Sequence, residues 1–488
     1  MATGISKTKW QGAPHPDSGN GSGSGITGVR LAYEGKKAES EILRTPAAKC
    51  RQLWPDSNGL SAVNRLYYGD NLPVLSALAQ DPAVCGHVRL VYIDPPYATK
   101  SVFQSRNLTD AYMDLLEGAH YLEFLRERLI FIREILADDG SIYVHLDDNM
   151  AFLVKAVMDE VFGRANFRNW ITRKKCNPKN YTRKTYGNVS DYILFYSKTD
   201  NYVWHRPVDP WTEQHSAREY QYAEAVTGRR YKKVPVHAPG VRNGETGRPW
   251  RGIAPPPGKH WQYTPRTLDE MDARGEIYWS PTGNPRRKIY LDQSEGVPVQ
   301  DIWLEYRDAH NQNIEVSGYP TEKNPDLLTR IINASSNVGD MVLDCFSGSG
   351  TTLNVASQLG RHWIGVDNSH EAIRATLRRF SKGLEPMGDF ASKLETGEKE
   401  ERPTTLSLFG PEETAASSAK KKARHQAITD FSLIARESKE GDLSEVMEHW
   451  LDWHGEGNAM QVAESPAVFG PGKPKKTATR ASHRKRPR

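Results

Sequence analysis

Short apolar runs alternate with amphipathic stretches in two separate parts of this 488-residue chain. In the first part we expect strands at 88–93 and 141–148, and helices at 119–137 and 150–162. The helix at 119–137 repeats its apolar residues at three- and four-residue intervals, which is the spacing of one buried helical face. Strands that alternate with helices predict an α/β fold with a mainly parallel sheet.

The alternation stops after a strand expected at 191–198 and resumes beyond residue 320. Between the two parts, 200–310 is rich in Pro, Gly, Trp, Tyr and Arg and has no long helical pattern, which predicts a separate, irregular or β-rich insertion. The other expected elements are a strand at 66–68, a helix at 72–79, helices at 324–336, 351–360 and 369–382, and strands at 341–346 and 362–367.

Composition divides the chain into five segments. The ends are polar, charged and weakly periodic, which is typical of disordered chain, although a short amphipathic stretch at 425–453 is compatible with a helix. The expected segments are a disordered 1–55, the first half of the α/β domain at 56–199, the insertion at 200–310, the second half at 311–395, and a charged, largely disordered tail at 396–488.

Apolar and cysteine content exclude several classes of protein. No apolar run is long enough to span a bilayer, and the N-terminal stretch has no hydrophobic segment typical of a secretory signal. We therefore expect no membrane partner and a reducing, cytoplasmic setting. The cysteines form no CxxC pair, which argues against a structural zinc site or a disulfide framework. They are Cys50, Cys85, Cys176 and Cys345.

The motif LVYIDPPYATK, at 90–100, joins an apolar strand to a stiff turn. Pro95 and Pro96 fix their φ angles and lack backbone donors, so the strand cannot continue through them. Asp94, free carbonyls and the Tyr97 ring are then held at the carboxyl end of a strand, where open α/β sheets bind their ligands. A proline-rich turn without a ligand is the alternative interpretation.

The second informative motif is MVLDCFSGSGTT, at 341–352, where a strand leads through Asp344 and two glycines into a helix. Gly348 and Gly350 allow close approach of a ligand to the backbone. A dinucleotide fingerprint would need a third glycine, but position 353 is leucine. Asp367, 23 residues after Asp344, is placed to accept from ribose hydroxyls. A ribose without a diphosphate points to S-adenosylmethionine (AdoMet); a glycine turn without a ligand remains the alternative.

These motifs together resemble the β-class amino-group DNA methyltransferases, a family that includes the modification subunits of type III restriction systems. DPPY before FSGSG, with a long variable stretch between them, is a highly specific signal of this family, because in most methyltransferases of this fold the AdoMet motif comes first. The matching pieces are YGDN (68–71), DPPY (94–97), SIYVHLDD (141–148), DYILFYSK (191–198), YPTEKN (319–324), DCFSGSGTT (344–352) and WIGVD (363–367).

The resemblance implies a Rossmann-like, AdoMet-dependent methyltransferase fold with circularly permuted motif order, in which 200–310 is a target-recognition insertion. By position, Asp367 would bind the cofactor ribose, Asp70 the adenine edge, and Thr321 and Lys323 the methionine end. The other residues that would line the cofactor are Asp344, Phe346, Gly348 and Gly350. One departure is YPTEKN where the family often has HPTxKP.

An exocyclic amine is a poor nucleophile, because its lone pair is conjugated with the ring. The Asp94 carboxylate and the Pro95 carbonyl, held by Pro96, are acceptors that would free this lone pair, while Tyr97 offers a face on which an extruded base can stack. No cysteine nucleophile is needed, and Cys345 is better interpreted as a small buried residue. His145, Asp147 and Asp148 either line the site or make structural hydrogen bonds.

The expected substrate is double-stranded DNA, methylated at adenine N6, in restriction-modification or related phage defence. Net charge is +5, and the stretch 168–188 is basic with interleaved aromatic residues, which is typical of a polyanion-binding surface. The expected DNA contacts are Arg173, Lys174, Lys175, Lys179, Arg183 and Lys184 for phosphates, and Arg248, Trp250 and Arg251, with Arg286 and Arg287, for bases.

Several alternatives remain open from the sequence. Cytosine N4 is the second candidate for the methylated atom, and an RNA or protein amide methyltransferase would use similar chemistry. A non-catalytic DNA-binding relative is disfavoured by the intact DPPY and FSGSG motifs. A restriction subunit and a homodimer are partners that the family allows, and no metal is expected.

Overall fold

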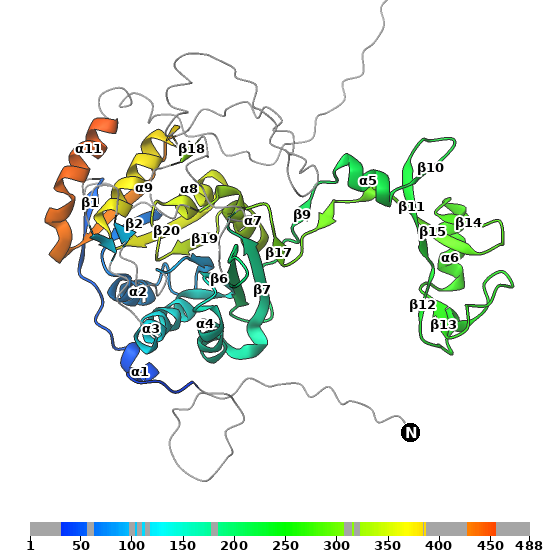
Figure 1. Cartoon of the computed structure of the whole chain (residues 1–488), viewed down its shortest axis with the longest axis horizontal. Coiled ribbons are helices and arrows are strands. Elements are labelled where there is room, and N and C mark those ends of the chain that lie inside the picture. The colour runs from blue at the N-terminus through cyan, green and yellow to red at the C-terminus, as the bar shows by residue number, and fades with distance from the viewer. Residues whose placement is uncertain are drawn as a thin grey trace, which may run out of the picture.

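The computed structural model describes residues 31–55, 63–96, 103–104, 110–112, 118–176, 184–306, 315–316, 323–383, 385–386 and 427–454. Within these residues ten strands form one large sheet (Figure 1). Their order across the sheet is β1 (Cys50–Trp54), β22 (Phe431–Arg436), β2 (Asn64–Tyr68), β20 (His362–Asp367), β19 (Met341–Asp344), β3 (Val88–Ile93), β6 (Leu136–Leu146), β8 (Ser190–Ser197), β7 (Phe167–Lys174) and β17 (Ile302–Trp303).

The centre of this sheet is parallel. Six consecutive strands, from β22 to β6, pair in parallel, whereas β8 runs antiparallel to both of its neighbours. Strands such as β3 read as continuous apolar runs because helices cover both faces. From β19 the chain proceeds to β20 on one side, and from β3 it proceeds to β6 on the other, so the direction of winding reverses between β19 and β3.

Helices lie on both faces of the sheet. The apolar side chains of α2, α3 and α4 form one core cluster against it, and those of α7, α8, α9 and α11 form a second cluster on the opposite face. A π-helical turn at Asp159–Gly163 extends α4. The helices are α1 (Glu39–Ile42), α2 (Asn71–Gln80), α3 (Ala119–Ile135), α4 (Ala151–Met158), α7 (Pro325–Ser335), α8 (Thr351–Gln358), α9 (His370–Lys382) and α11 (Ser444–His454).

Between β8 and β17 the chain forms a separate lobe that lies to one side of the sheet (Figure 1). Its own small core contains Val236, Trp250, Trp261, Leu268 and Met271. Its elements are β9 (Val208–Asp209), α5 (Glu213–Glu219), β10 (Tyr222–Ala223), β11 (Arg230–Pro235), β12 (His237–Pro239), β13 (Lys259–Trp261), α6 (Pro265–Ala273), β14 (Ile277–Trp279), β15 (Pro285–Tyr290) and β16 (Val297–Pro298).

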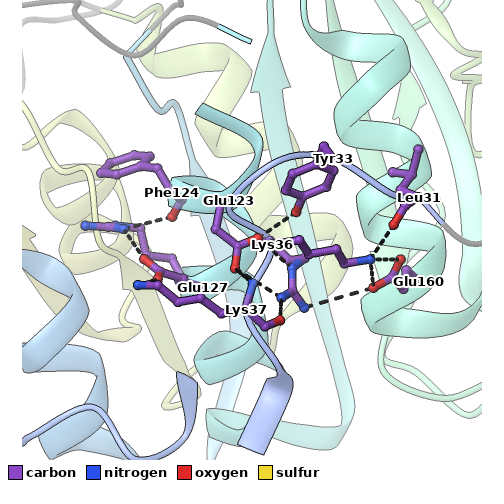
Figure 2. Close-up of polar contacts among 10 residues, drawn as sticks. Leu31, Tyr33, Lys36, Lys37, Glu123, Phe124, Glu127 and Glu160 are labelled. Atoms are coloured by element: carbon purple, nitrogen blue, oxygen red, sulfur yellow. Dashed lines mark hydrogen bonds and ion pairs between the residues drawn. The ribbon is translucent and has the colours of Figure 1, made fainter. Parts of the chain in front are cut away.

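The expectation that 1–55 is disordered is wrong for the part that the structure describes. Figure 2 shows the contacts of this segment with α3. The Tyr33 hydroxyl donates to Glu123 at 2.6 Å, and Lys37 Nζ donates to Glu127 at 2.6 Å. Lys36 Nζ forms an ion pair, at 2.7 Å, with Glu160 Oε1 in the π-helical turn that extends α4. These partners are about ninety or more positions away in the chain, so local composition could not indicate them.

The expectation of a largely disordered tail from 396 onward is also wrong for 427–454. Phe431–Arg436 forms β22 beside β2, and β1 pairs with its other edge. Burial of Phe431, Leu433 and Ala435 on the sheet provides the driving force. Within the stretch 425–453, which was compatible with a helix, the described part contains β22, a 3-10 helix and then α11.

One boundary in the first half also differs from its prediction. The helix expected at 119–137 ends at Ile135, and the strand begins at once at Leu136, rather than after a loop at Asp138–Gly140. A Cβ on Gly140 would lie 2.9 Å from the carbonyl oxygens of Ala137, in the same strand, and of Val88 in β3, so the backbone is packed too closely for a side chain there. Among the described residues no helix is long and apolar enough to cross a membrane.

Candidate active site

The two informative motifs meet where the winding of the sheet reverses. Asp94 directly follows β3 and Asp344 ends β19, and the two strands are hydrogen-bonded neighbours. In open α/β sheets this position, at the carboxyl ends of the strands, is where ligands bind. Lys323 Nζ lies 2.9 Å from Asp94 Oδ2, with 9% and 19% of the two side chains exposed. Lys323, expected at the methionine end of a cofactor, therefore contacts the acid of the DPPY motif.

Asp344 is buried and accepts a hydrogen bond from the backbone N–H of Phe346 at 3.0 Å. Burial raises the pKa of its carboxyl to about 7, against hydrogen bonds from Thr352 and Phe346 that lower it, and the charges of Asp94 and Asp367 raise it further. Burial likewise raises the pKa of Asp367. Buried carboxyl groups whose pKa values are raised in this way favour a cationic ligand.

The glycine turn between Asp344 and α8 needs its glycines. Gly348 and Gly350 have φ angles of +50° and +72°, and a Cβ on Gly350 would lie 2.7 Å from the Thr376 side chain. The Gly348 N–H donates to Asp367 Oδ2 at 2.8 Å, which ties the turn to the end of β20. The turn therefore packs directly against Thr376 of α9, and a side chain at Gly350 would not fit.

A buried arginine organises the end of β2. Arg128, on α3, donates to Asp70 Oδ1 at 3.0 Å and to Asn71 Oδ1 at 2.5 Å, and its guanidinium lies 3.6 Å from the centre of the Phe124 ring. Asn71 in turn donates to the carbonyl of Cys345 at 2.7 Å, beside Asp344. Sequence reasoning missed Arg128, although a charge three residues after Leu125 on the apolar face of the predicted helix was the available signal.

Behind Asp94 lies a buried polar network that crosses four strands. The Tyr92 hydroxyl is 2.8 Å from His145 Nδ1, and His145 Nε2 is 2.9 Å from Asp191 Oδ2. Arg173 donates to both oxygens of Asp191, at 2.8 and 2.5 Å. Burial lowers the pKa of His145 from its usual 6.5, against the raising effect of Asp191, so the ring is neutral at pH 7. His145 is thus a structural residue one strand away from Asp94.

Arg173 does not fit its expected role as a DNA contact. Its side chain is fully buried, and its partner Asp191 is also buried. The reason is that alternate residues of a strand face opposite sides, and Arg173 faces the sheet interior. Asp147 accepts a hydrogen bond from the Met150 N–H at the start of α4, and Asp148 accepts one from the side chain of Asn188, 40 positions further along the chain.

Trp250 and Arg251 also lie elsewhere than expected. Trp250 is 1% exposed, stacks with Trp279 at 5.0 Å and donates to Asp269, so it is a core residue of the lobe. Arg251 pairs with Asp269 and with Asp272 on α6.

The other expected DNA contacts divide by exposure. Lys174 and Lys175 are half-buried at the end of β7, whereas Lys184, Arg248 and Arg286 are exposed. Arg287 donates to the Tyr263 hydroxyl at 2.8 Å. Tyr97, Lys179, Arg183 and Thr321 lie outside the described residues. Among the residues that are described, no group of three or more His, Cys, Asp or Glu side chains could hold a metal ion.

Residues 88–378 match the N6/N4 DNA methylase family model, and this span contains both motifs of the site. The chain belongs to the N6/N4 DNA methylase family. It is 44% identical over 432 residues to the type II methyltransferase M.EcaI of Enterobacter cloacae, which covers 87% of this chain and 91% of M.EcaI.

This methylase is therefore an AdoMet-dependent DNA methyltransferase of the restriction-modification type. A more distant relative is the StyLTI Mod subunit of a type III restriction-modification enzyme from Salmonella typhimurium, 27% identical over 334 residues, which cover 61% of this chain and 50% of the subunit. Among solved structures, the M1.HpyAVI–SAM complex is similar, with a TM-score of 0.36 and 15% identity over 64% of this chain and 98% of that one.

Proposed function

We propose that this methylase transfers a methyl group from AdoMet to the exocyclic N6 amine of adenine in double-stranded DNA. The observation that carries the proposal is the meeting of Asp94 and Asp344 at the carboxyl ends of β3 and β19. One residue begins the stiff DPPY turn, and the other leads into the glycine turn before α8. The DPPY form of the turn favours adenine over cytosine, as the family resemblance implies.

The Asp94 turn would supply the acceptors that the reaction needs. The Asp94 carboxylate and the Pro95 carbonyl accept the N–H groups of the target amine and free its lone pair, and the two prolines keep these acceptors fixed before the base arrives. Lys323 Nζ, 2.9 Å from Asp94 Oδ2, holds the carboxylate in place. The proton of the amine can leave after transfer, so Asp94 need not be a strong base.

The residues around the glycine turn fit AdoMet, which when bound supplies an activated methyl group on a sulfonium. Its charge is positive, and the buried carboxyl groups of Asp344 and Asp367, both with raised pKa values, favour a cation. Gly348 and Gly350 leave the backbone accessible, and Asp367 and Asp70 would bind the adenosine half. Two buried oxygens near this turn, Ser347 Oγ and Asn354 Oδ1, have no hydrogen-bond partner among the described residues, as expected for groups that contact a ligand.

The sheet would be a Rossmann-like methyltransferase sheet with circularly permuted motif order, in which DPPY comes before FSGSG. The lobe between β8 and β17 would recognise the DNA sequence. Support for the reading role comes from its separate core and from cations placed on aromatic rings. Lys233 Nζ lies 3.6 and 3.4 Å from the ring centres of Tyr222 and Tyr278. The exposed Arg248 and Arg286 are the remaining expected base contacts, and a restriction subunit is the partner that Mod-type relatives suggest.

Nucleoside mass spectrometry on unmethylated DNA treated with the protein and AdoMet tests the proposal. N6-methyladenine is the expected product. N4-methylcytosine would retain the Asp94 chemistry but overturn the base assignment. Methylation of structured RNA or protein in the same competition assay, with none on DNA, would overturn the substrate. Bound AdoMet with no modified product on DNA of random sequence would contradict the proposed activity of the isolated chain.

A further inference from the structure

The segment 427–454 lies outside the span that matches the family model, yet it is part of the same sheet. β22 pairs in parallel with β2 over the whole of that strand, from Asn64 opposite Phe431 to Tyr68 opposite Ala435. Parallel strands bring their carboxyl ends to the same edge of a sheet. The chain that follows Arg436 therefore emerges at the edge where β2 and β20 present Asp70 and Asp367.

An aromatic cluster fixes this segment to the domain. Trp450 of α11 is fully buried, with its ring centre 5.4 Å from Phe431 and 5.5 Å from Trp54 of β1. Phe431 also lies 5.8 Å from Trp363 of β20. Burial of rings of this size contributes several kcal/mol, so the segment is a firm part of the fold rather than a loose tail.

The 3-10 helix after β22 (Glu437–Leu443) carries a lysine to the end of β20. Lys439 Nζ donates to the backbone carbonyl of Asn368 at 3.2 Å, and lies 4.8 Å from the centre of the Tyr68 ring. The approach is close at backbone level too, because a Cβ on Gly69 would be 3.2 Å from the Arg436 Cβ. Asn368 directly follows Asp367, and Tyr68 lies two residues before Asp70; these are the two acids expected to hold the adenosine half of the cofactor.

From these contacts we infer that Lys439 is a cofactor-positioning residue, which makes segment 427–454 part of the adenosine side of the AdoMet site. Its ammonium fixes the Asn368 carbonyl, and its charge favours the ionised form of the neighbouring Asp367, the form that accepts from ribose hydroxyls. This inference rests on the proposed binding of AdoMet at the glycine turn. The positive charge of Lys439 lies beside the end of β20. The acids Asp344 and Asp94 lie at the ends of β19 and β3, one and two strands further along the sheet, so Lys439 is separated from them.

Burial opposes ionisation of Asp367 and raises its pKa, while the charge of Lys439 lowers it. Removing that charge would leave the carboxyl more readily protonated and Asn368 less fixed. The loss would apply equally to AdoMet and to S-adenosylhomocysteine, because the two molecules share the adenosine half and differ at the sulfur. A residue that acted on the sulfonium would instead separate the two ligands.

Titration calorimetry of the full-length protein with AdoMet and with S-adenosylhomocysteine tests the inference. Lys439→Met should weaken both ligands about five- to tenfold, as expected for loss of one charge-assisted contact, and Lys439→Arg should restore most of the affinity. The matched control is Lys49→Met, an exposed lysine just before β1 on the same unit. The thermal unfolding midpoint without ligand should be the same for all four proteins.

Unchanged affinity in Lys439→Met would overturn the inference and leave the proposed function intact. A lower unfolding midpoint for Lys439→Met without ligand would also overturn it, because the role of Lys439 would then be structural. If the wild-type protein bound neither ligand, the AdoMet site itself would be refuted, and the inference would fall with it.

Discussion

The raised pKa of the buried Asp344 predicts how the variant Asp344→Asn differs in stability and in AdoMet binding. Asparagine retains the size of the side chain, can still accept from the Phe346 N–H, and can donate to Thr352. Asparagine also removes the negative charge of the carboxylate, whose burial is unfavourable when no cation is bound. We expect the variant to be more stable than the wild type at pH 8 without ligand, and to bind AdoMet more weakly.

The magnitude follows from the pKa of Asp344, which rises from 3.8 to about 7 on folding, mainly through burial. At 1.36 kcal/mol per pKa unit this difference corresponds to about 4 kcal/mol. Because the folded state binds the proton more tightly, stability decreases as pH rises from about 4 to about 7, and the full cost is present above pH 7. Asp344→Asn removes this dependence, so its advantage is near zero at pH 4 and about 4 kcal/mol above pH 7.

Urea denaturation of the ligand-free proteins between pH 5 and 9 measures this difference, with the exposed Asp200→Asn as the matched control. Calorimetry with AdoMet should show a loss of affinity on the order of 10- to 100-fold for Asp344→Asn, the loss expected for a hydrogen bond to a charged group. Parallel pH profiles for wild type and Asp344→Asn would refute the reasoning, as would a variant less stable than the wild type at pH 8.

Two further predictions concern positions where the fold holds the site. Arg173→Ala leaves the buried Asp191 carboxylate without its bidentate partner, so we expect a loss of about 3–5 kcal/mol in urea denaturation; a loss as small as that of the exposed Lys184→Ala would contradict the buried pairing. Gly350→Ala combines a φ of +72° with a contact to Thr376, so we expect about 1–3 kcal/mol of destabilisation. Most of this loss should persist in Gly350→Ala with Thr376→Ser, and complete recovery would show that backbone strain plays no part.

The fold of the central sheet was largely predictable because its signals are local. The strand expected at 362–367 is His362–Asp367, and the helix expected at 369–382 is His370–Lys382, since each combines apolar periodicity with a clear end signal. Asp94 and Asp344 were identified because breaker residues mark the ends of their strands. The neighbouring positions of β3 and β19 followed only from the resemblance, since no local pattern specifies which strands pair.

What the sequence concealed depends on contacts between distant segments. A strand at Phe431–Arg436 adds to the sheet beside β2, and its pattern is too short to stand out in a charged tail. Tyr33 and Lys37 were assigned to disorder because their partners lie on α3. Arg173 and Trp250 were assigned to the DNA surface because residue type alone does not distinguish a buried guanidinium or indole from an exposed one.

The account depends most on Asp94 as the acceptor of the target amine, and Asp94→Asn tests this directly. The measurement is single-turnover methyl transfer to DNA, together with the AdoMet dissociation constant. We expect the rate to fall about 100-fold or more, as for removal of a preorganised acceptor, while AdoMet binds within about twofold of wild type, since the proposal assigns Asp94 to the target base. A rate within tenfold of wild type, or a joint loss of transfer and AdoMet binding, would contradict the assigned role.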